Sequence, residues 1–177
     1  MKRVLFTIAF VHSMSILSGQ NNNIRLMVDS LKDMNSDTLD CSADLYWRII
    51  AKGEDAIPFL IEKLTDTTQT NVKWHCKKTR LNVGEVANFA LNAIGEFPAY
   101  FITRIQFDLI YIDETGQSCW TFYDYFFDNA NKPTYQQSVR SWYEKEKGNY
   151  KKERITGKRL TDCEKKFGVT AYYRWSK

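Results

Sequence analysis

Several residue types and motifs are scarce or absent, and each absence narrows the class of protein. Only three prolines and eight glycines occur among the 177 residues, which argues against a low-complexity or disordered protein. Beyond the first twenty residues, no stretch is long and apolar enough to span a bilayer. No glycine-rich phosphate loop, GxSxG, HExxH or calcium-loop spacing occurs. We therefore predict a protein that is not an enzyme, with no catalytic residues and no cofactor.

Metal ligands are equally scarce. His75 is the only histidine beyond the first nineteen residues, and no CxxC spacing occurs. One imidazole without clustered thiols cannot fill a zinc shell, so no metal site is predicted. Cys76 follows His75 directly, and adjacent side chains diverge on a helix or a strand, which argues against a Cys–His catalytic pair. Acidic residues that could act in acid–base chemistry stand at expected helix ends and turns, where they are ordinary: Glu85, Glu96, Asp108, Asp113 and Glu114.

The first nineteen residues have the pattern of a cleaved signal peptide. Lys2 and Arg3 precede the apolar run of residues 4–11, which is too short to cross a bilayer, and small residues then lead into QNNN. We predict cleavage before Gln20, which leaves 20–177 as one domain. Gln20 also stands where a lipoprotein would carry its lipidated cysteine. The expectation is a soluble protein of a bacterial periplasm, or a secreted one.

All four cysteines lie in this mature part, and an even number in an exported chain predicts two disulfides, with three pairings possible. The formal charge of +4 is unevenly distributed. Residues 20–139 carry eleven Lys/Arg against sixteen Asp/Glu, whereas residues 140–177 carry twelve against five. The basic C-terminal part 140–177 could meet an anionic partner, or could be a solvated tail, which we favour. Nucleic acid is not an expected partner of an exported protein.

The segment GEDAIPFLIEKLTD, residues 53–66, places a proline beside an apolar helix stripe. Ile57, Leu60, Ile61 and Leu64 fall at i, i+3, i+4 and i+7, the spacing of one buried helix face. Pro58 is compatible with this helix only in its first turn, where its missing N–H has no intrahelical partner. Similar spacing predicts helices over 24–34, 43–52 and 83–94, with Gly53 and Gly95 ending the last two.

Residues 53–95 resemble the two-helix HEAT-type repeat. The resemblance rests on a glycine, an alanine–aliphatic–proline triplet, a leucine-rich helix closed by Asp66, and a second Val/Ala-rich helix ending in Ile94–Gly95. It departs from the family in a long polar insertion between the two helices. It implies that the proline bends the outer helix over the inner one. The residues that carry it are Gly53, Ala56, Ile57, Pro58, Leu60, Leu64 and Asp66, then Val83, Val86, Ala87, Ala90, Leu91, Ile94 and Gly95.

The flanks extend this interpretation to an all-α fold, a short HEAT-like superhelix of two to three helical hairpins with an irregular, aromatic-rich C-terminal part. Residues 24–34 and 42–52 would be a degenerate first repeat, 97–112 would open a third, and 134–147 would be a late inner or capping helix. For residues 107–127 a β-hairpin competes with the helix, because strand-prone residues flank a DETG turn. We favour the helix there.

The repeat resemblance further implies a binding face and a disulfide pattern. Inner helices of such arrays line a concave surface. Opposite the buried stripes, this surface would comprise Glu85, Asn88, Phe89 and Asn92, next to Asp44, Trp47 and Arg48. Cys41, Cys76 and Cys119 would lie in turns along one rim, which favours the pairs Cys41–Cys76 and Cys119–Cys163.

We therefore expect a non-catalytic protein-interaction module whose partner is another protein, and in its sharper form an immunity-type inhibitor of a toxin delivered to the periplasm. The alternative is a cell-wall or glycan binder that uses exposed tryptophans, among Trp74, Trp120, Trp142 and Trp175, with the basic C-terminal part. Fold alone does not decide between them.

Overall fold

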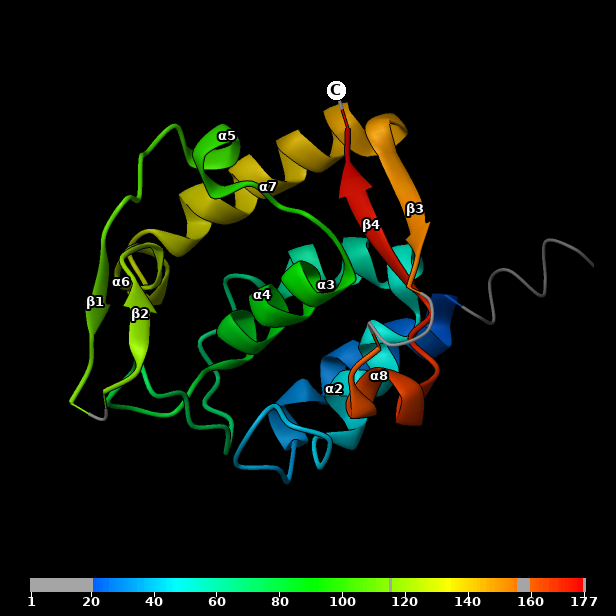
Figure 1. The fold of residues 1–177 in the computed structure, drawn as a ribbon, viewed down its shortest axis with the longest axis horizontal. Coiled ribbons are helices and arrows are strands. Elements are labelled where there is room, and N and C mark those ends of the chain that lie inside the picture. Colours follow the sequence, from blue (N-terminus) through cyan, green and yellow to red (C-terminus); the bar gives the residue numbers. More distant parts are fainter. Residues whose placement is uncertain (1–20, 115, 156–159, 177) are drawn as a thin grey trace, which may run out of the picture.

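The computed structural model describes residues 21–114, 116–155 and 160–176. The predicted signal peptide, 1–19, lies outside these residues. Helices make up most of the described chain, and two antiparallel two-stranded sheets, β1–β2 and β3–β4, stand at opposite ends of it (Figure 1).

Four predicted helices are confirmed close to their expected bounds. Residues 21–29 are helical and continue into the 3-10 turn η1 (Ser30–Asp33). They are followed by α2 (Asp44–Ile50) and, further along, by α4 (Val83–Ile94). The capping helix predicted over 134–147 is α7 (Lys132–Glu146). In each case an apolar stripe at helical spacing supplies a buried face.

Pro58 occupies the position that the sequence requires. A 3-10 turn, η2 (Gly53–Ala56), leads into α3 (Ile57–Lys63), and the proline lies in the first turn of α3. There its ring costs no intrahelical hydrogen bond. α3 then packs against α4, so the two helices of the predicted repeat are neighbours in the fold.

The expected all-α superhelix is wrong, because four segments form strands. After the short helix α5 (Ala99–Thr103), β1 (Ile110–Ile112) pairs with β2 (Ser118–Trp120). In 107–127 the hairpin, not the favoured helix, is therefore correct. The described residues of the C-terminal part include regular helices and strands rather than an irregular chain. After the 3-10 turn η3 (Lys147–Asn149), β3 (Tyr150–Arg154) pairs with β4 (Ala171–Trp175), and α8 (Asp162–Phe167) lies between these two strands in sequence.

One hydrophobic cluster runs through these elements, from Ile24 near the N-terminal end to Val169 before β4. α7 packs against α3 and α5, and β4 packs against α4, where it joins the end of that helix through a bridge between Gly95 and Tyr173. The aromatic helix α6 (Phe122–Phe127) connects the β1–β2 hairpin to α7.

The disulfide pairing also differs from the prediction. Cys41 bonds Cys163, with Cα atoms 4.9 Å apart, and Cys76 bonds Cys119, with Cα atoms 5.5 Å apart. The predicted pairs assumed cysteines in successive turns along one rim. Instead, α8 packs on α2 and brings Cys163 to Cys41, while β2 lies beside the loop that carries Cys76. Two disulfides are typical of proteins in oxidising compartments outside the cytosol.

Candidate functional site

The predicted binding face on α4 is largely buried. Glu85 and Asn88 have 0% and 1% of their surface exposed, because α7 and the 67–82 loop cover this side of the helix. Tyr135 of α7 donates a hydrogen bond of 2.9 Å from its hydroxyl to Asn88 Oδ1. Phe89 is half-buried between aromatic rings, and only Asn92 is exposed. Glu85 and Asn88 therefore stabilise the fold and are not part of an exposed surface.

Glu85 is the centre of a buried charge cluster. Its carboxylate accepts from Lys132 Nζ at 3.0 Å and from Lys77 Nζ at 2.6 Å, and it closes a capping box with Asn82 at the start of α4. Burial lowers the pKa of Lys132, and the adjacent Glu85 carboxylate opposes that shift. Since each polar group has a partner, the cluster ties α4 to α7.

In the α2 part of the predicted face, the charged side chains are exposed and the tryptophan is half-buried. Asp44 and Arg48 form an exposed ion pair at 3.7 Å. Trp47 is stacked on Phe167 of α8, and its indole N–H donates to Asp40 O at 2.8 Å. The seven predicted residues therefore do not form one continuous exposed face.

The tryptophans proposed for glycan stacking also have protein partners. Trp74 packs on Phe89, Trp120 on Phe122, and Trp142 on Trp175, with centroid distances of 4.6–5.0 Å. All four rings are half-buried rather than exposed. Charges of the basic C-terminal part are partly paired locally, as in the bridge between Arg174 and Glu153 across β3–β4. These positions are ordinary for core and surface residues.

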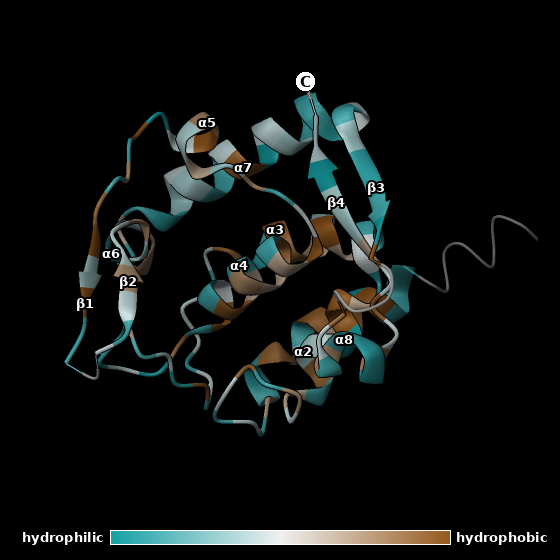
Figure 2. Cartoon of the chain, in the orientation of Figure 1, coloured by the Kyte–Doolittle hydropathy of each residue, from teal (hydrophilic) through white to brown (hydrophobic). Residues whose placement is uncertain are grey.

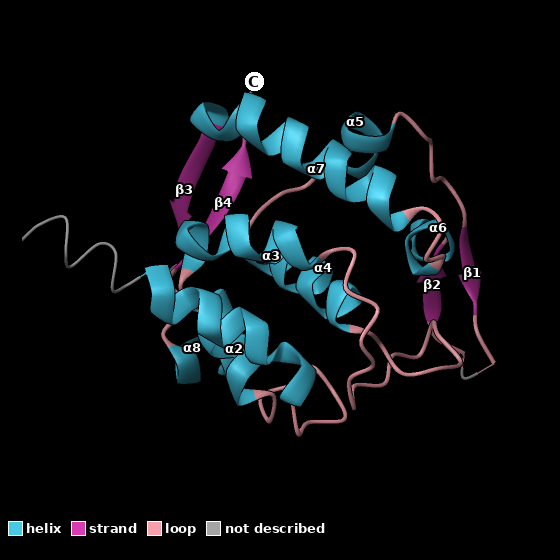
Figure 3. Ribbon diagram, turned by 180° about the vertical axis from the view of Figure 1, so that it is seen from behind, coloured by secondary structure: helices cyan, strands magenta, loops and turns pink. Residues whose placement is uncertain are grey.

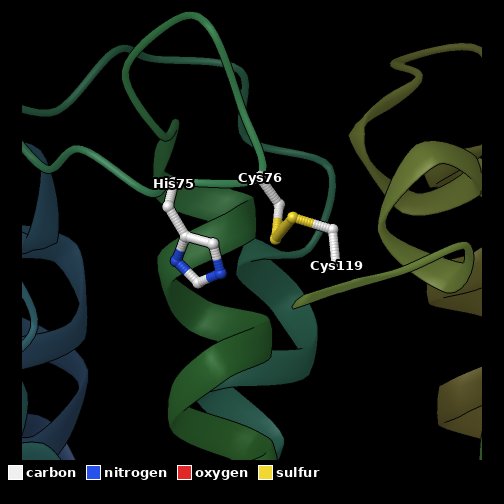
Figure 4. Close-up of side chains that lie close together, drawn as sticks. All are labelled: His75, Cys76 and Cys119. Carbon is white, nitrogen blue, oxygen red and sulfur yellow. A yellow bond between two sulfur atoms is a disulfide. The ribbon is translucent and has the colours of Figure 1, made fainter. Parts of the chain in front are cut away.

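His75, Cys76 and Cys119 come together at one place, with potential ligand atoms within 4.8 Å of one another (Figure 4). The two sulfurs, however, are joined to each other in the disulfide. They are therefore not thiolates, which are the form of cysteine that binds metals and acts as a nucleophile. In this state the cluster fastens β2 to the loop that carries residues 75 and 76.

A different surface has the character of a binding site. Eight large hydrophobic side chains are exposed among the described residues, and seven of them lie between residues 100 and 112. We call these seven the apolar edge. Figure 2 shows hydrophobic colouring along the segment that leads into β1. The residues are Tyr100, Phe101, Ile105, Leu109, Ile110, Tyr111 and Ile112.

Local sequence explains the shape of the apolar edge. Pro98 precedes α5, and Arg104 ends that helix in the left-handed conformation, with φ of 63°. Residues 104–109 then lead to β1 without helix or strand. The chain reverses direction between β1 and β2, where Asp113 N donates to Gln117 O at 2.8 Å and Gly116 has φ of 82°. Such positive φ values in turns favour glycine. The exposed segment is thus held at both ends, by α5 and by the turn.

A pocket of about 450 Å³ lies next to the apolar edge, between α5 and the hairpin. Aromatic rings from both sides line it: Tyr100, Phe101, Phe107 and Trp120. The Trp120 indole N–H donates to Phe107 O at 2.6 Å, which fixes that wall. An apolar pocket with a few polar groups beside exposed hydrophobic residues suits the anchor side chain of a partner.

The sequence held one signal for this site. The run FDLIYI is almost continuously apolar and has neither a helical nor a strand period. Periodicity alone therefore cannot distinguish a buried helix from a strand in this segment. In the hairpin Phe107 packs against the core, whereas the four residues that follow Asp108 are exposed: Leu109, Ile110, Tyr111 and Ile112.

No protein-family model, curated protein or solved structure matches the chain. Its resemblance to HEAT-type repeats therefore stays a prediction. Among the described residues, no helix has the length and apolar character that a bilayer crossing requires.

Proposed function

We propose that the protein is an exported, non-catalytic interaction module that binds another protein through the apolar edge. The observation that carries this proposal is the concentration of exposed large hydrophobic residues in 100–112. Contiguous exposed apolar patches commonly mark interaction sites, and aromatic anchors dominate binding energy at such sites. The surface differs from the α2–α4 face predicted from sequence, but the class of function is the same.

Export is part of this proposal and has two supports. The first is the signal-peptide pattern of residues 1–19, and the second is the pair of disulfides. We propose the bacterial periplasm or the extracellular medium as the destination. Sequencing the mature N-terminus tests it: we expect a chain that begins at Gln20, and an intact Met1 in the envelope fraction would contradict cleavage.

The sharper form of the proposal is an inhibitor that caps a secreted toxin. Such a role needs a rigid complementary surface and no catalytic group, and rigidity reduces the entropy lost on binding. The disulfide Cys76–Cys119 holds the hairpin to the rest of the protein. A toxin gene beside the gene for this protein, and loss of the toxin's activity on mixing the two products, would support this form. Glycan binding has less support, because the tryptophans are packed against other rings.

A pull-down from envelope extract tests the surface. The variant Ile110→Lys/Ile112→Lys places two charges on the apolar edge, and Leu26→Lys is the matched control, since Leu26 is 66% exposed but lies outside it. We expect the double variant to recover at least tenfold less of the partner, while the control recovers as much as wild type. Substitutions at such exposed positions should change stability by less than about 0.5 kcal/mol.

Equal recovery by the double variant would show that the apolar edge is not the binding surface. If no variant recovers a protein while purified peptidoglycan co-sediments with wild type, glycan binding replaces protein binding as the function.

A further inference from the structure

We propose that the free edge of β1 accepts an extended segment of the partner as a third strand, and that this segment combines aliphatic side chains with Lys or Arg. The inference rests on the proposed function and names the partner chemistry at the same surface.

The register of the hairpin decides which backbone groups of β1 are available. Leu109 O accepts from Thr121 N at 3.0 Å, and Asp113 N donates to Gln117 O at 2.8 Å, so these two pairs are hydrogen-bonded ones. In an antiparallel ladder such pairs alternate with non-hydrogen-bonded pairs. Ile110 and Ile112 are opposite Trp120 and Ser118 in the alternate positions. Their N–H and C=O groups therefore point away from β2.

The opposite edge of this sheet is already covered. Ser118 O points away from β1, and it lies 3.3 Å from His75 Nε2 and 3.8 Å from Cys76 Sγ. The disulfide Cys76–Cys119 fixes this contact. Among the described residues no third strand pairs with the outer edge of β1, and Ile110 and Ile112 on that strand are exposed. In both ribbon views β1 is the outer strand of the hairpin (Figures 1 and 3).

The two sheets of the molecule differ in how their edges are protected. β3 exposes a charged run, Lys151 to Arg154, and charged side chains on an edge strand discourage pairing with other chains. β1 exposes Ile–Tyr–Ile, with Ile110 and Ile112 at 67% and 64%. Tyr111 is directed toward α6, where its hydroxyl donates to Asp124 Oδ1 at 3.1 Å. Of the two described strands β1 and β3, β1 presents apolar side chains beside its outward backbone groups, whereas β3 presents charged ones.

The charge around β1 selects the partner. Residues 105–131 contain five acidic residues and no Lys or Arg: Asp108, Asp113, Glu114, Asp124 and Asp128. Lys77 and Lys78 lie beside Tyr111 and Ile112 as well, but Lys77 pairs with the buried Glu85 and Lys78 forms an exposed bridge with Glu114. Complementary potentials steer association and exclude partners of the wrong sign. An extended segment that adds to β1 therefore gains from aliphatic residues over Ile110 and Ile112 and from cations beside the carboxylates.

Amide hydrogen exchange followed by NMR tests the inference on the full mature protein with both disulfides intact. The probe is a capped ten-residue peptide of alternating valine and lysine, and the matched peptide has glutamate in place of lysine. We expect the lysine peptide to slow exchange at the amides of Ile110 and Ile112 at least tenfold. The amide of Tyr111, which the register directs toward β2, should change little. The glutamate peptide should leave all three unchanged.

Two variants at residue 112 distinguish the contribution of the backbone N–H to peptide binding from that of the side chain. Ile112→Pro removes an outward N–H, which edge positions tolerate, while Ile112→Thr keeps the β-branched shape and the amide. We expect the proline variant to weaken binding of the lysine peptide about tenfold, and the threonine variant to weaken it much less. The exchange readout uses wild type, so it stands even if the proline variant fails to fold.

Each remaining outcome contradicts strand addition in a recognisable way. If the lysine peptide binds without protecting Ile110 and Ile112, side-chain docking replaces strand addition while the proposed function stands. If it does not bind, or the glutamate peptide binds equally, the inferred partner chemistry is wrong, and the pull-down still judges the function separately. If the two amides are protected before any peptide is added, and the protein sediments as a dimer, the occupant is a second copy.

Discussion

At the scale of the single residue, Glu85 joins three segments of the chain. Its carboxylate binds Lys77 in the loop, Asn82 at the start of α4 and Lys132 at the start of α7. Two cations and one anion are held together here, with Glu85 and Lys132 almost completely buried. Removing one member of such a cluster is costly because the charges that remain have lost their compensation.

We therefore expect Glu85→Gln to lower the free energy of unfolding by about 3–5 kcal/mol. Lys132→Met added to Glu85→Gln should recover part of this loss, since it removes one of the uncompensated cations. Urea denaturation of the single and double variants measures both values. A single variant as stable as wild type would mean that the cluster does not hold α4 to α7.

Tyr150 gives the fold a pH dependence. Its hydroxyl donates to Glu96 O at 2.6 Å and accepts from Trp142 Nε1 at 3.2 Å. Burial raises the pKa of Tyr150 to about 12, from an ordinary value of 10.0. A phenol whose pKa is higher in the folded state contributes stability that is complete below pH 10 and is lost as the pH rises toward 12.

Tyr150→Phe should therefore cost about 1 kcal/mol at pH 8, and the difference from wild type should shrink between pH 10 and pH 12. Tyr100→Phe is the control, because Tyr100 is 52% exposed. Chemical denaturation at pH 8 and pH 11 compares the two. A Tyr150→Phe effect of the same size at both pH values would refute the coupling.

Among the secondary-structure elements, helices with a regular apolar period could be predicted from the sequence, whereas strands that depend on long-range pairing could not. α4 and α7 follow from apolar residues at helical spacing. The apolar residues before the DETG turn are compatible with a helix and with a strand. The pairing with β2 and the Cys76–Cys119 bond, which the local sequence does not show, select the strand. The segment of β3 is predicted to be part of a solvated tail, because YKKER has no alternation of apolar and polar residues. Its pairing with β4, a strand far along the chain, is not visible in the local sequence.

The burial of Glu85 and Asn88 in the predicted face could not be foreseen from the sequence for the same reason. Glu85 and Asn88 are polar and lie opposite the apolar stripe of α4, which is the normal pattern of a solvated face. α7, almost fifty residues further along the chain, supplies Lys132 and Tyr135 as their partners. Such partners cannot be found from the local pattern, whereas the helix bounds can.

The contact of α3 with α4 depends on a residue without a side chain. A Cβ placed on Gly84 would collide with the Leu64 carbonyl, whereas one on Gly148 would meet nothing within 4 Å. We expect Gly84→Ala to lower stability by about 1–3 kcal/mol. The control Gly148→Ala should be neutral or slightly stabilising, since it restricts the unfolded chain. Thermal denaturation of both decides it, and equal melting temperatures would contradict the close packing.

At the scale of the whole molecule, the two disulfides close loops of different size. Cys41–Cys163 spans 122 residues and joins α8 to the segment before α2, while Cys76–Cys119 spans 43. Restricting a longer loop removes more entropy from the unfolded chain. The first bond therefore acts on global stability, and the second holds the hairpin that carries the apolar edge.

From loop entropy alone, Cys41→Ser/Cys163→Ser should cost about 1 kcal/mol more than Cys76→Ser/Cys119→Ser. Only the second pair should speed amide exchange in β1 and β2 while the core helices stay protected. Denaturation and exchange together measure this. Loss of hairpin protection in the first variant alone would reverse these assignments.

We propose that the partner binds the apolar edge rather than the α2–α4 face. Site-specific photo-crosslinking tests it most directly, with p-benzoylphenylalanine in place of Ile110, of Asn92 or of Leu26, all of which are exposed. Each purified variant is irradiated in envelope extract, and products are identified by mass spectrometry. We expect one cross-linked partner protein from position 110 and none from positions 92 and 26. A partner captured from position 92 but not from position 110 would contradict it.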